Sequence, residues 1–412
     1  MPTCGSGSAA RGGPGSARSF TRPGRRGWST RPVGPWRKDG FQRMKIWLSE
    51  WLLYIGLLSG ATALSASLTE GARRLALRWD VLDHPAGRKI HHRPTPLLGG
   101  AAIAATFYLV TLGCAAAVLS IDRLGMAWLR ETVEDLLGPG GERKALGILL
   151  GGLLMFLLGV VDDLKALRPK WKLAGQIAIS LLTVWFGVRA ELFVFRDPVS
   201  STLLTVFWLV LVTNSMNLLD NMDGLCGGIS IIAAATLAVA MQSGSDTVIA
   251  RGLLFIFMGS VAGFLWHNRP PARIFMGDSG AMFNGYLLAA VSVAGTFHVE
   301  GQGPRLSVVA PLLALSVPLF DTLSVIWIRL RHGDSIFLGD KRHFSHRLVE
   351  AGMSRPGAVG FILLVGALVG LNAAMLPNLD AWDLALVLLH TTGLFALIVI
   401  LMRTGRGTHG DR

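Results

Sequence analysis

Long apolar runs separated by short polar stretches dominate this chain. Eleven runs are long enough to cross a bilayer as a helix of about 20 residues. They lie near residues 47–69, 98–119, 145–161, 173–188, 201–219, 224–242, 251–267, 280–298, 306–328, 357–376 and 382–402. Lipid offers no partners to exposed backbone groups, and the alternating pattern of a membrane barrel is absent. The sequence therefore predicts an all-α polytopic integral membrane protein with about 11 transmembrane helices.

The distribution of Lys and Arg predicts the orientation of these helices. One set of alternate loops holds 21 basic residues and the opposite set holds 8. Basic loops stay on the cytoplasmic side of a membrane. The predicted cytoplasmic set is 70–97, 162–172, 268–279, 329–356 and the C-terminus from residue 403. With eleven helices, the N-terminus is predicted outside and the C-terminus in the cytoplasm.

The first 43 residues differ from the rest of the chain. They contain nine basic residues and one acid, which is +8 of the total charge of +13. This tail is rich in Gly, Ser, Pro and Arg and is predicted to be disordered. No nucleic-acid-binding fold is predicted for this tail, so we expect no nucleic-acid partner. We also expect translation to start at Met44, which leaves a single transmembrane domain at 44–402 and a short cytoplasmic tail at 403–412.

Composition agrees with a membrane protein. Hydrophobic residues make up 51% of the chain and charged residues 16%, whereas soluble domains carry about 25% charged residues. The mean hydropathy is +0.50. Cys4, Cys114 and Cys226 lie far apart, which argues against a disulfide framework or a zinc site.

The unusual polar clusters all fall on the predicted cytoplasmic side. They are DHPAGRKIHHRPTPLLGG (83–100), VVDDLKALRPKWKL (160–173), NSMNLLDNMDGLCGG (214–228), RIFMGDSG (273–280) and GDKRHFSHRL (339–348). Transporters usually place such residues near the bilayer midplane, often in paired repeats, and no repeat is seen. An active site at the cytoplasmic surface explains the clustering. Its loops are predicted to be 70–97, 162–172, 220–224, 268–279 and 329–356.

The residue types in these clusters suggest one chemistry. Hard oxygen donors suited to Mg²⁺ or Mn²⁺ come from Asp162, Asp163, Asp220, Asp223 and Asp278. Charges and donors suited to phosphates come from Lys89, Lys172, Arg342, His343 and His346. Singly, each is also an ordinary feature of a helix end or a basic loop. Together on one face, acidic metal ligands and bases predict a site that handles a diphosphate.

The segment at 214–228 has the most regular spacing. Four polar side chains fall on one helical face, over an arc of about 120°: Asn214, Asn217, Asp220 and Asn221. The Asp223-Gly224 pair then ends the helix and lets the backbone approach a ligand.

In order and spacing, these motifs resemble the polyprenyl-phosphate N-acetylhexosamine-1-phosphate transferases over roughly residues 47–356. These are integral membrane enzymes that start bacterial cell-surface glycan synthesis. The resemblance is carried by Asp83, Pro85, Arg88, Lys89, His91, Pro94–Pro96, Gly99 and Gly100; by Asp162, Asp163, Lys172, Leu173 and Gln176; by Asn214, Asn217, Asp220, Asp223, Gly224 and Leu225; by Met276, Gly277, Asp278 and Gly280; and by the basic segment DKRHFSHRL.

The resemblance implies transfer of a sugar-1-phosphate from a UDP-sugar to undecaprenyl phosphate, with release of UMP, at the cytoplasmic face of the bacterial inner membrane. It implies Mg²⁺, or Mn²⁺, held by Asp278 with Asn217 assisting. The implied catalytic set is Asp162, Asp163, Asp220, Asp223, His343 and His346. The implied substrate-binding set is Lys89, Lys172, Asn214, Asn217, Asp220, Asp223, Arg342, His343 and His346. Within this family, the flanks of the basic segment favour N-acetylglucosamine as the sugar.

Two positions depart from the family pattern. Asn221 stands where the family usually has Gly, and Ser345 stands where it usually has a third His. Neither change removes an expected metal ligand. Two alternatives stay open: a phospho-N-acetylmuramoyl-pentapeptide transferase, and a non-catalytic or transport membrane protein. The sequence does not decide between a monomer and a homodimer.

Overall fold

The computed structural model describes residues 35–83, 94–121, 141–190, 197–241, 245–295, 309–335, 342–376 and 381–404. The chain divides into two compact units, Met1–Ser49 and Glu50–Arg412, and the second holds the predicted site. Residues 35–43 of the predicted tail belong to a helix that begins at Pro35, while 1–34 lie outside the described part.

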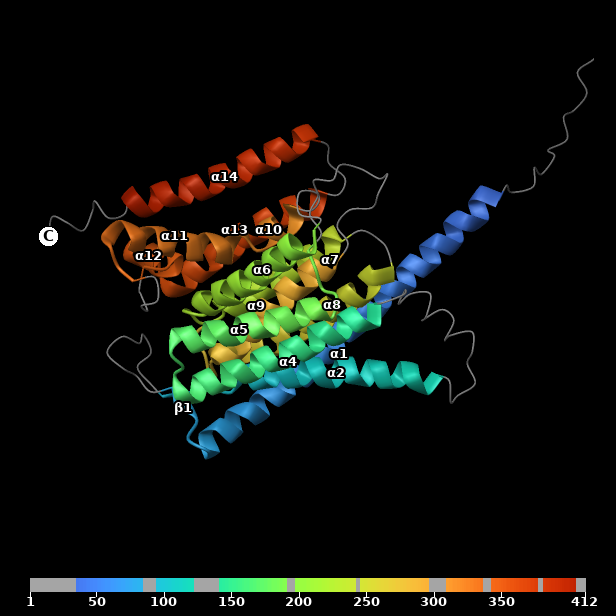
Figure 1. Cartoon of the computed structure of the whole chain (residues 1–412), viewed down its shortest axis with the longest axis horizontal. Coiled ribbons are helices and arrows are strands. Elements are labelled where there is room, and N and C mark those ends of the chain that lie inside the picture. The colour runs from blue at the N-terminus through green and yellow to red at the C-terminus, as the bar shows by residue number, and fades with distance from the viewer. Residues whose placement is uncertain are drawn as a thin grey trace, which may run out of the picture. The chain divides into compact units, whose positions relative to one another are not determined.

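Helices make up nearly all of the described structure (Figure 1). Their bounds are α1 Pro35–Arg78, α2 Gly99–Ile121, α4 Gly141–Lys165, α5 Pro169–Trp185, α6 Pro198–Leu219, α7 Leu225–Ala240, α8 Ser245–Asn268, α9 Gly277–Ala294, α10 Ala310–Ala314, α11 Ser316–His332, α12 Phe344–Glu350, α13 Arg355–Met375 and α14 Ala381–Thr404. Two short strands, β1 Leu82–Asp83 and β2 Thr95–Pro96, pair antiparallel. The prediction of an all-α polytopic membrane protein is confirmed.

Each predicted apolar segment coincides with a helix, except that the ninth is divided at Leu315 into α10 and α11. Seven of the described helices are long and apolar enough to cross a membrane. They are α1 over Glu50–Arg78, α2, α4, α6, α8, α13 and α14. The count of eleven spans and the orientation of the termini stay predictions.

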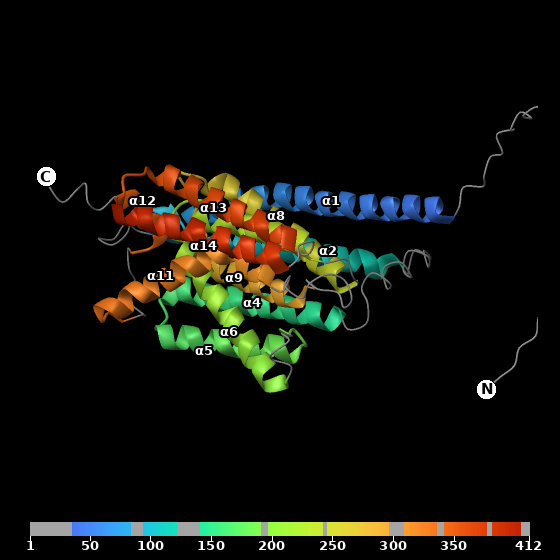
Figure 2. The same cartoon turned by 90° about the horizontal axis from the view of Figure 1, so that it is seen from above.

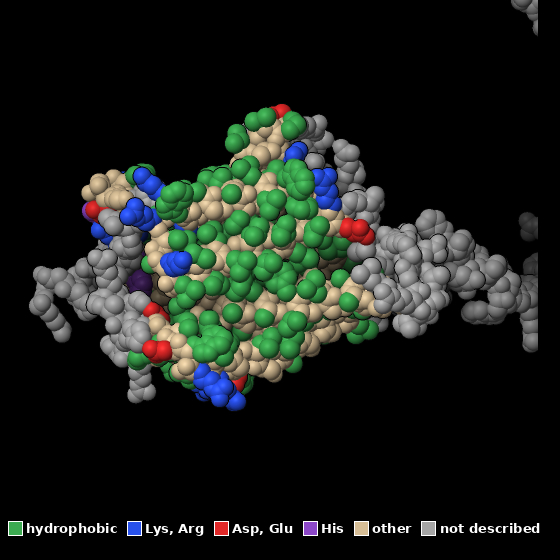
Figure 3. Space-filling view, turned by 60° about the horizontal axis from the view of Figure 1, so that its bottom comes forward, with side chains coloured by type: hydrophobic (Ala, Val, Ile, Leu, Met, Phe, Trp, Pro, Cys, Tyr) green, Lys and Arg blue, Asp and Glu red, His purple; other side chains and the backbone are tan. Residues whose placement is uncertain are grey.

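The surface of the helical unit is what a bilayer requires. Figure 3 shows hydrophobic side chains covering a broad band, with Lys, Arg, Asp and Glu gathered toward its two ends. Large apolar side chains are also exposed on α14: Trp382 is 83% exposed and Leu389 is 70% exposed. A soluble protein rarely exposes apolar surface on this scale, so this band is the lipid-facing surface.

Helix α9 lies at the centre of the packing and runs beside α4 and α6 in both views (Figures 1 and 2). Its residues from Ser279 to Ser292 are all buried. Glycines allow its backbone to approach its neighbours: a Cβ on Gly159 would lie 2.4 Å from Ser279 Cα, and one on Gly285 would lie 2.7 Å from Thr213 Cα. This backbone-to-backbone packing brings the ends of α4, α6 and α9 together.

Glycines spaced four apart along other helices also pack inside the chain. A Cβ on Gly147 would lie 2.4 Å from Phe186 Cβ, and one on Gly151 would lie 2.0 Å from the Tyr286 hydroxyl. Gly370 packs in the same way against Thr236. These glycines therefore serve contacts between helices of one chain.

Candidate active site

Four helix ends meet around the Lys172 side chain in α5. Its Nζ lies 2.6 Å from Asp162 Oδ2 at the end of α4. It also donates to Asn217 Oδ1 in the last turn of α6, at 2.8 Å, and to Asp278 Oδ2 in the first turn of α9, at 3.0 Å. Asn217 Nδ2 donates to the other Asp278 oxygen at 2.8 Å. The structure thus brings four predicted site residues into one hydrogen-bonded cluster.

The two carboxylates of this cluster differ in how far they are exposed. The Asp162 side chain is only 7% exposed, while that of Asp278 is 41% exposed. Asp162 Oδ1 also accepts the Leu167 backbone N–H at 2.8 Å. A buried charge is tolerated only when it is paired and hydrogen-bonded, so Lys172 and the backbone compensate Asp162. Asp278 is the carboxylate of this pair that a ligand reaches directly.

Asp163 faces a different partner from its neighbour. Its Oδ1 accepts the Asp278 backbone N–H at 2.8 Å and its Oδ2 accepts the Ser279 N–H at 3.0 Å. These are free N–H groups at the start of α9, where a negative charge is favoured. Gly277, with φ +74°, makes the turn, and a Cβ there would lie 2.9 Å from Asp163 Oδ2. Asp163 therefore holds the turn that carries Asp278.

The turn between α6 and α7 carries Asp220 and Asp223. Helix α6 ends at Leu219, so the prediction that Asp223-Gly224 ends the helix was wrong, and Asp220 and Asn221 lie in the turn rather than on the helical face with Asn214 and Asn217. Gly224, with φ +77°, precedes α7, and its N–H is bound by Asn268 Oδ1 at 2.9 Å. Asp223 Oδ2 accepts the Ala272 N–H at 2.9 Å, which ties this turn to the segment before α9. Burial raises the pKa of Asp220 to about 8, and the nearby Asp278 and other carboxylates add to the shift. A cation near this group would relieve that repulsion.

Asn214 lies one turn further into α6 and is bound by a buried residue of α5. Its Nδ2 donates to Gln176 Oε1 at 2.6 Å, and Gln176 is fully buried. The structure uses this predicted substrate-binding residue in a contact between α5 and α6.

The basic segment leads into α12. Arg342 Nη1 pairs with Asp334 Oδ2 at 2.7 Å. His343 Nδ1 lies 2.9 Å from Asp321 Oδ2, and the centroids of the His343 and His346 rings are 6.4 Å apart. Lys89 and His91 lie outside the described residues.

The two departures from the family pattern contact each other. Ser345 Oγ donates to Asn221 Oδ1 at 2.6 Å. This bond joins the first turn of α12 to the turn that carries Asp220. The basic segment therefore lies against the turn that follows α6, the helix whose last turn carries Asn217.

Sequence reasoning missed two elements of the site. The only sequence signal for Asp321 was that a charged residue stands in an otherwise apolar segment. The sequence showed the motif glycines but not their packing: Gly100 N–H donates to Met276 O at 2.9 Å, and a Cβ on Gly100 would lie 2.3 Å from Gly280 N. They let the start of α2 lie against the start of α9, beside Asp278.

The residues around Lys172 fit a divalent cation. The exposed Asp278 carboxylate supplies hard oxygens, whereas the point where oxygens of Asp162, Asn217 and Asp278 meet is filled by the Lys172 ammonium, so an ion would bind beside that point. Within the described ranges, no group of three or more His, Cys, Asp or Glu side chains is arranged to hold a metal ion. Magnesium needs only one or two carboxylates, since water and phosphate oxygens complete its shell.

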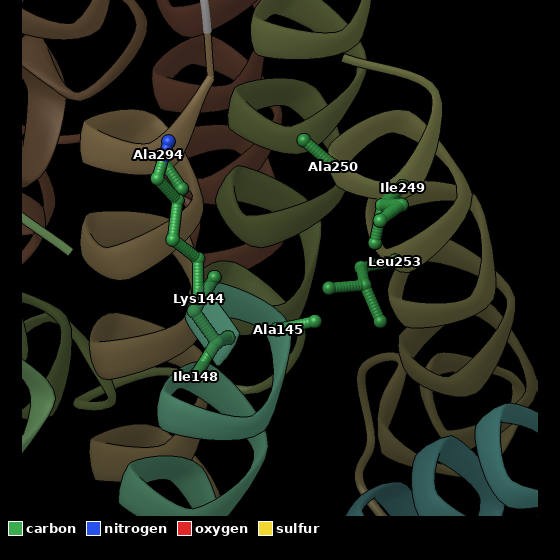
Figure 4. Close-up of a pocket in the computed structure, with 7 residues that line it drawn as sticks. All are labelled: Lys144, Ala145, Ile148, Ile249, Ala250, Leu253 and Ala294. Carbon is green, nitrogen blue, oxygen red and sulfur yellow. The ribbon is translucent and has the colours of Figure 1, made fainter. Parts of the chain in front are cut away.

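A separate small pocket lies at the opposite ends of the same helices (Figure 4). It is lined by Lys144, Ala145 and Ile148 of α4, Ile249, Ala250 and Leu253 of α8, and Ala294 of α9. Asp162 lies near the other end of α4, and Asp278 near the other end of α9. This pocket is therefore not part of the site.

The chain is similar to known proteins over most of its length. The profile of glycosyl transferase family 4 matches residues 145–296, which run from α4 to the end of α9. The chain is 31% identical over 339 residues to a probable undecaprenyl-phosphate N-acetylglucosaminyl 1-phosphate transferase of Bacillus subtilis, covering 81% of this chain and 87% of that protein.

Two further relatives carry similar names. A decaprenyl-phosphate N-acetylglucosaminephosphotransferase of Mycolicibacterium smegmatis is 31% identical over 383 residues, covering 87% of this chain and 90% of that protein. The undecaprenyl-phosphate alpha-N-acetylglucosaminyl 1-phosphate transferase of Escherichia coli K12 is 25% identical over 310 residues, covering 72% of this chain and 77% of that protein.

Proposed function

The chain belongs to glycosyl transferase family 4, and on this premise we propose that it is a membrane phosphotransferase. It moves N-acetylglucosamine 1-phosphate from UDP-N-acetylglucosamine to a polyprenyl phosphate such as undecaprenyl phosphate. The products are UMP and a lipid-diphosphate sugar that starts the synthesis of a cell-surface glycan. The observation that carries the proposal is the convergence of Asp162, Asn217 and Asp278 on the Lys172 ammonium.

The reaction needs positioning more than acid–base chemistry. An oxygen of the polyprenyl phosphate attacks the phosphorus that bears the sugar, and the bond from that phosphorus to the bridging oxygen of UMP breaks. The attacking phosphate is already an anion at neutral pH, so no proton has to be removed. Catalysis of phosphoryl transfer rests on alignment and charge neutralisation.

The protein's own residues supply both. The Lys172 ammonium lies among the oxygens of Asp162, Asn217 and Asp278 and is placed to neutralise a phosphate oxygen. Asp163 holds the turn that aims Asp278. His343 and His346 add donors from α12.

We propose that Mg²⁺, or Mn²⁺, is the cofactor, held by Asp278 with Asn217. When bound, it would neutralise diphosphate oxygens. The support is that the Asp278 carboxylate, which Asn217 contacts, offers hard oxygen donors on the exposed side of the cluster.

The names of the three relatives favour N-acetylglucosamine over a muramoyl-pentapeptide donor, because each contains N-acetylglucosamine. Membership of a transferase family likewise favours an enzyme over a transporter. The basic residues on the side of the cluster favour a site at the cytoplasmic face of the bacterial inner membrane.

The test uses purified protein with a short-chain polyprenyl phosphate, Mg²⁺ and UDP-N-acetylglucosamine. We expect UMP release and sugar in the lipid phase, both lost when the metal is chelated. UDP-N-acetylmuramoyl-pentapeptide, assayed in parallel, should give no product. Turnover of that donor alone would replace the proposed sugar, and a folded protein inactive with both would refute the reaction.

A further inference from the structure

Asp321 is a buried carboxylate that the proposed reaction does not use directly. It lies in the second turn of α11 and is fully buried. An isolated charge in such a place is costly, so its partners indicate why it is there.

Both oxygens of Asp321 are bound by the basic segment. Oδ2 lies 2.9 Å from His343 Nδ1, and Oδ1 accepts the Phe344 backbone N–H at 2.6 Å. Phe344 is the first residue of α12, so its N–H is a helix-start donor. One carboxylate therefore fixes both the imidazole and the start of the helix behind it.

This contact decides which His343 nitrogen faces a ligand. A carboxylate only accepts hydrogen bonds, so Nδ1 carries the proton and Nε2 is the nitrogen left for a substrate. Among the described residues, the hydrogen bond of the His343 ring is the one through Nδ1. His343 is 5% exposed, which limits its ring to the orientation that Asp321 sets.

The first turn of α12 is also bound to the turn that carries Asp220. Ser345, two residues after His343, donates to Asn221 beside Asp220. Phe344, between them, is fully buried and packs edge-on against Phe320 with ring centroids 5.6 Å apart. His343 is thus fixed from both sides.

We propose that Asp321 is a positioning residue of the transferase: it accepts the Nδ1–H of His343 and fixes the ring so that the Nε2–H of the imidazolium form donates to a substrate phosphate. This inference rests on the proposed function and deepens it. Partners of this kind orient functional imidazoles, and their loss typically costs about 10–100-fold in activity.

The experiment is a double-mutant cycle on kcat with Asp321→Asn, His343→Ala and the double variant. Asn keeps the size of the side chain but removes the negative charge and can turn a donor toward Nδ1, which releases the ring from the required orientation. We expect each single variant to lose at least about 10-fold, and the double variant to lose no more than His343→Ala alone. Asp321→Glu, which retains a carboxylate, should recover part of the loss.

The matched control is Asp197→Asn. Asp197 also accepts backbone N–H groups at a helix start, those of Val199 and Ser200. It lies at the end of α6 opposite to Asn217. Asn and Asp are equally good at such a position, so this variant should keep wild-type kcat.

A second measurement does not depend on turnover. Hydrogen exchange of the Phe344 amide should be protected in the wild type and accelerate in Asp321→Ala, but not in Asp197→Asn. The positioning role would be overturned if the fold losses in kcat of the two single variants multiply in the double variant. It would also be overturned if Asp321→Asn keeps wild-type kcat. If the wild type turns over no donor, the proposed function fails, and unchanged exchange at Phe344 would separately overturn the contact.

Discussion

Adjacent residues in this site have different partners. Asp162 pairs with Lys172, whereas Asp163 binds the backbone at the start of α9. Neighbours on a helix point about 100° apart, and here the two carboxylates contact different elements. The sequence predicted both carboxylates in the site. The partner of each depends on which neighbouring helix it faces, α5 for Asp162 and α9 for Asp163.

Asp278→Asn should reduce turnover by about 10³-fold with the protein still folded. The change removes a charge from the exposed carboxylate that contacts Lys172 and Asn217, and groups that stabilise transition-state charge are worth about 10²–10³ each. UMP release measures the effect, and thermal unfolding in detergent checks the fold. Near-normal activity would exclude Asp278 as the metal ligand.

The raised pKa of Asp220 couples metal binding to pH. With a pKa of about 8 in the metal-free protein, this carboxyl is mostly protonated at pH 6.5. A divalent cation nearby favours the ionised form, so binding releases a proton. The apparent Kd for Mg²⁺ should therefore fall as pH rises from about 6.5 and level off above about 8. Calorimetric titration of the wild type and Asp220→Asn tests this, and an equal slope in both would exclude Asp220.

The Ser345–Asn221 bond should contribute measurable coupling. Ser345→Ala and Asn221→Ala each remove one partner of a 2.6 Å hydrogen bond, and such bonds contribute about 1 kcal/mol. The double variant should therefore be about 1 kcal/mol more stable than the sum of the single losses predicts. Unfolding in detergent measures it. As a control, the stability losses of Ser59→Ala on α1 and Asn221→Ala should add in the double variant.

At the scale of elements, the site is built from helix ends that glycines bring together. The starts of α2 and α9 lie in contact because Gly100 and Gly280 have no side chains. The segment before α9 also pairs with β2, since the Phe275 N–H donates to Pro96 O at 2.8 Å. The sequence showed these glycines as part of a motif, and the packing gives their physical role.

Gly100→Ala should destabilise the fold and reduce activity. The new Cβ would lie 2.3 Å from Gly280 N, so α2 and α9 must separate, and overpacking of this kind costs about 1–3 kcal/mol. Gly113→Ala in the same helix is the control, since nothing lies within 4 Å of its Cβ position. Thermal unfolding should separate the two variants, and equal stability would refute the close contact.

At the scale of the whole molecule, an apolar band lies between two polar ends (Figure 3). The cluster around Lys172 lies at one end of the helices that form it, because α4 and α6 end there while α5 and α9 begin there. One-sided placement of the polar motifs was predicted from the order of apolar segments alone.

Labelling from outside the cell tests the predicted orientation. Lys170→Cys lies on the proposed cytoplasmic side, and Val199→Cys lies at the opposite end of the helices; both positions are exposed. In a chain without its three native cysteines, a membrane-impermeant thiol reagent should label only Val199→Cys in intact cells. Labelling of Lys170→Cys instead would reverse the topology.

The sequence by itself determined the helical class, the order of the apolar segments and the polar residues of the site. Apolar length and clustered charge are local properties, so they can be seen without a structure. Only the tertiary structure decided which polar groups meet. In the structure, Asp163 accepts a backbone N–H at the start of α9, Asn214 donates to Gln176, and Asp321 contacts the His343 ring. Those pairings join residues far apart in the chain, because they depend on which helix faces lie in contact.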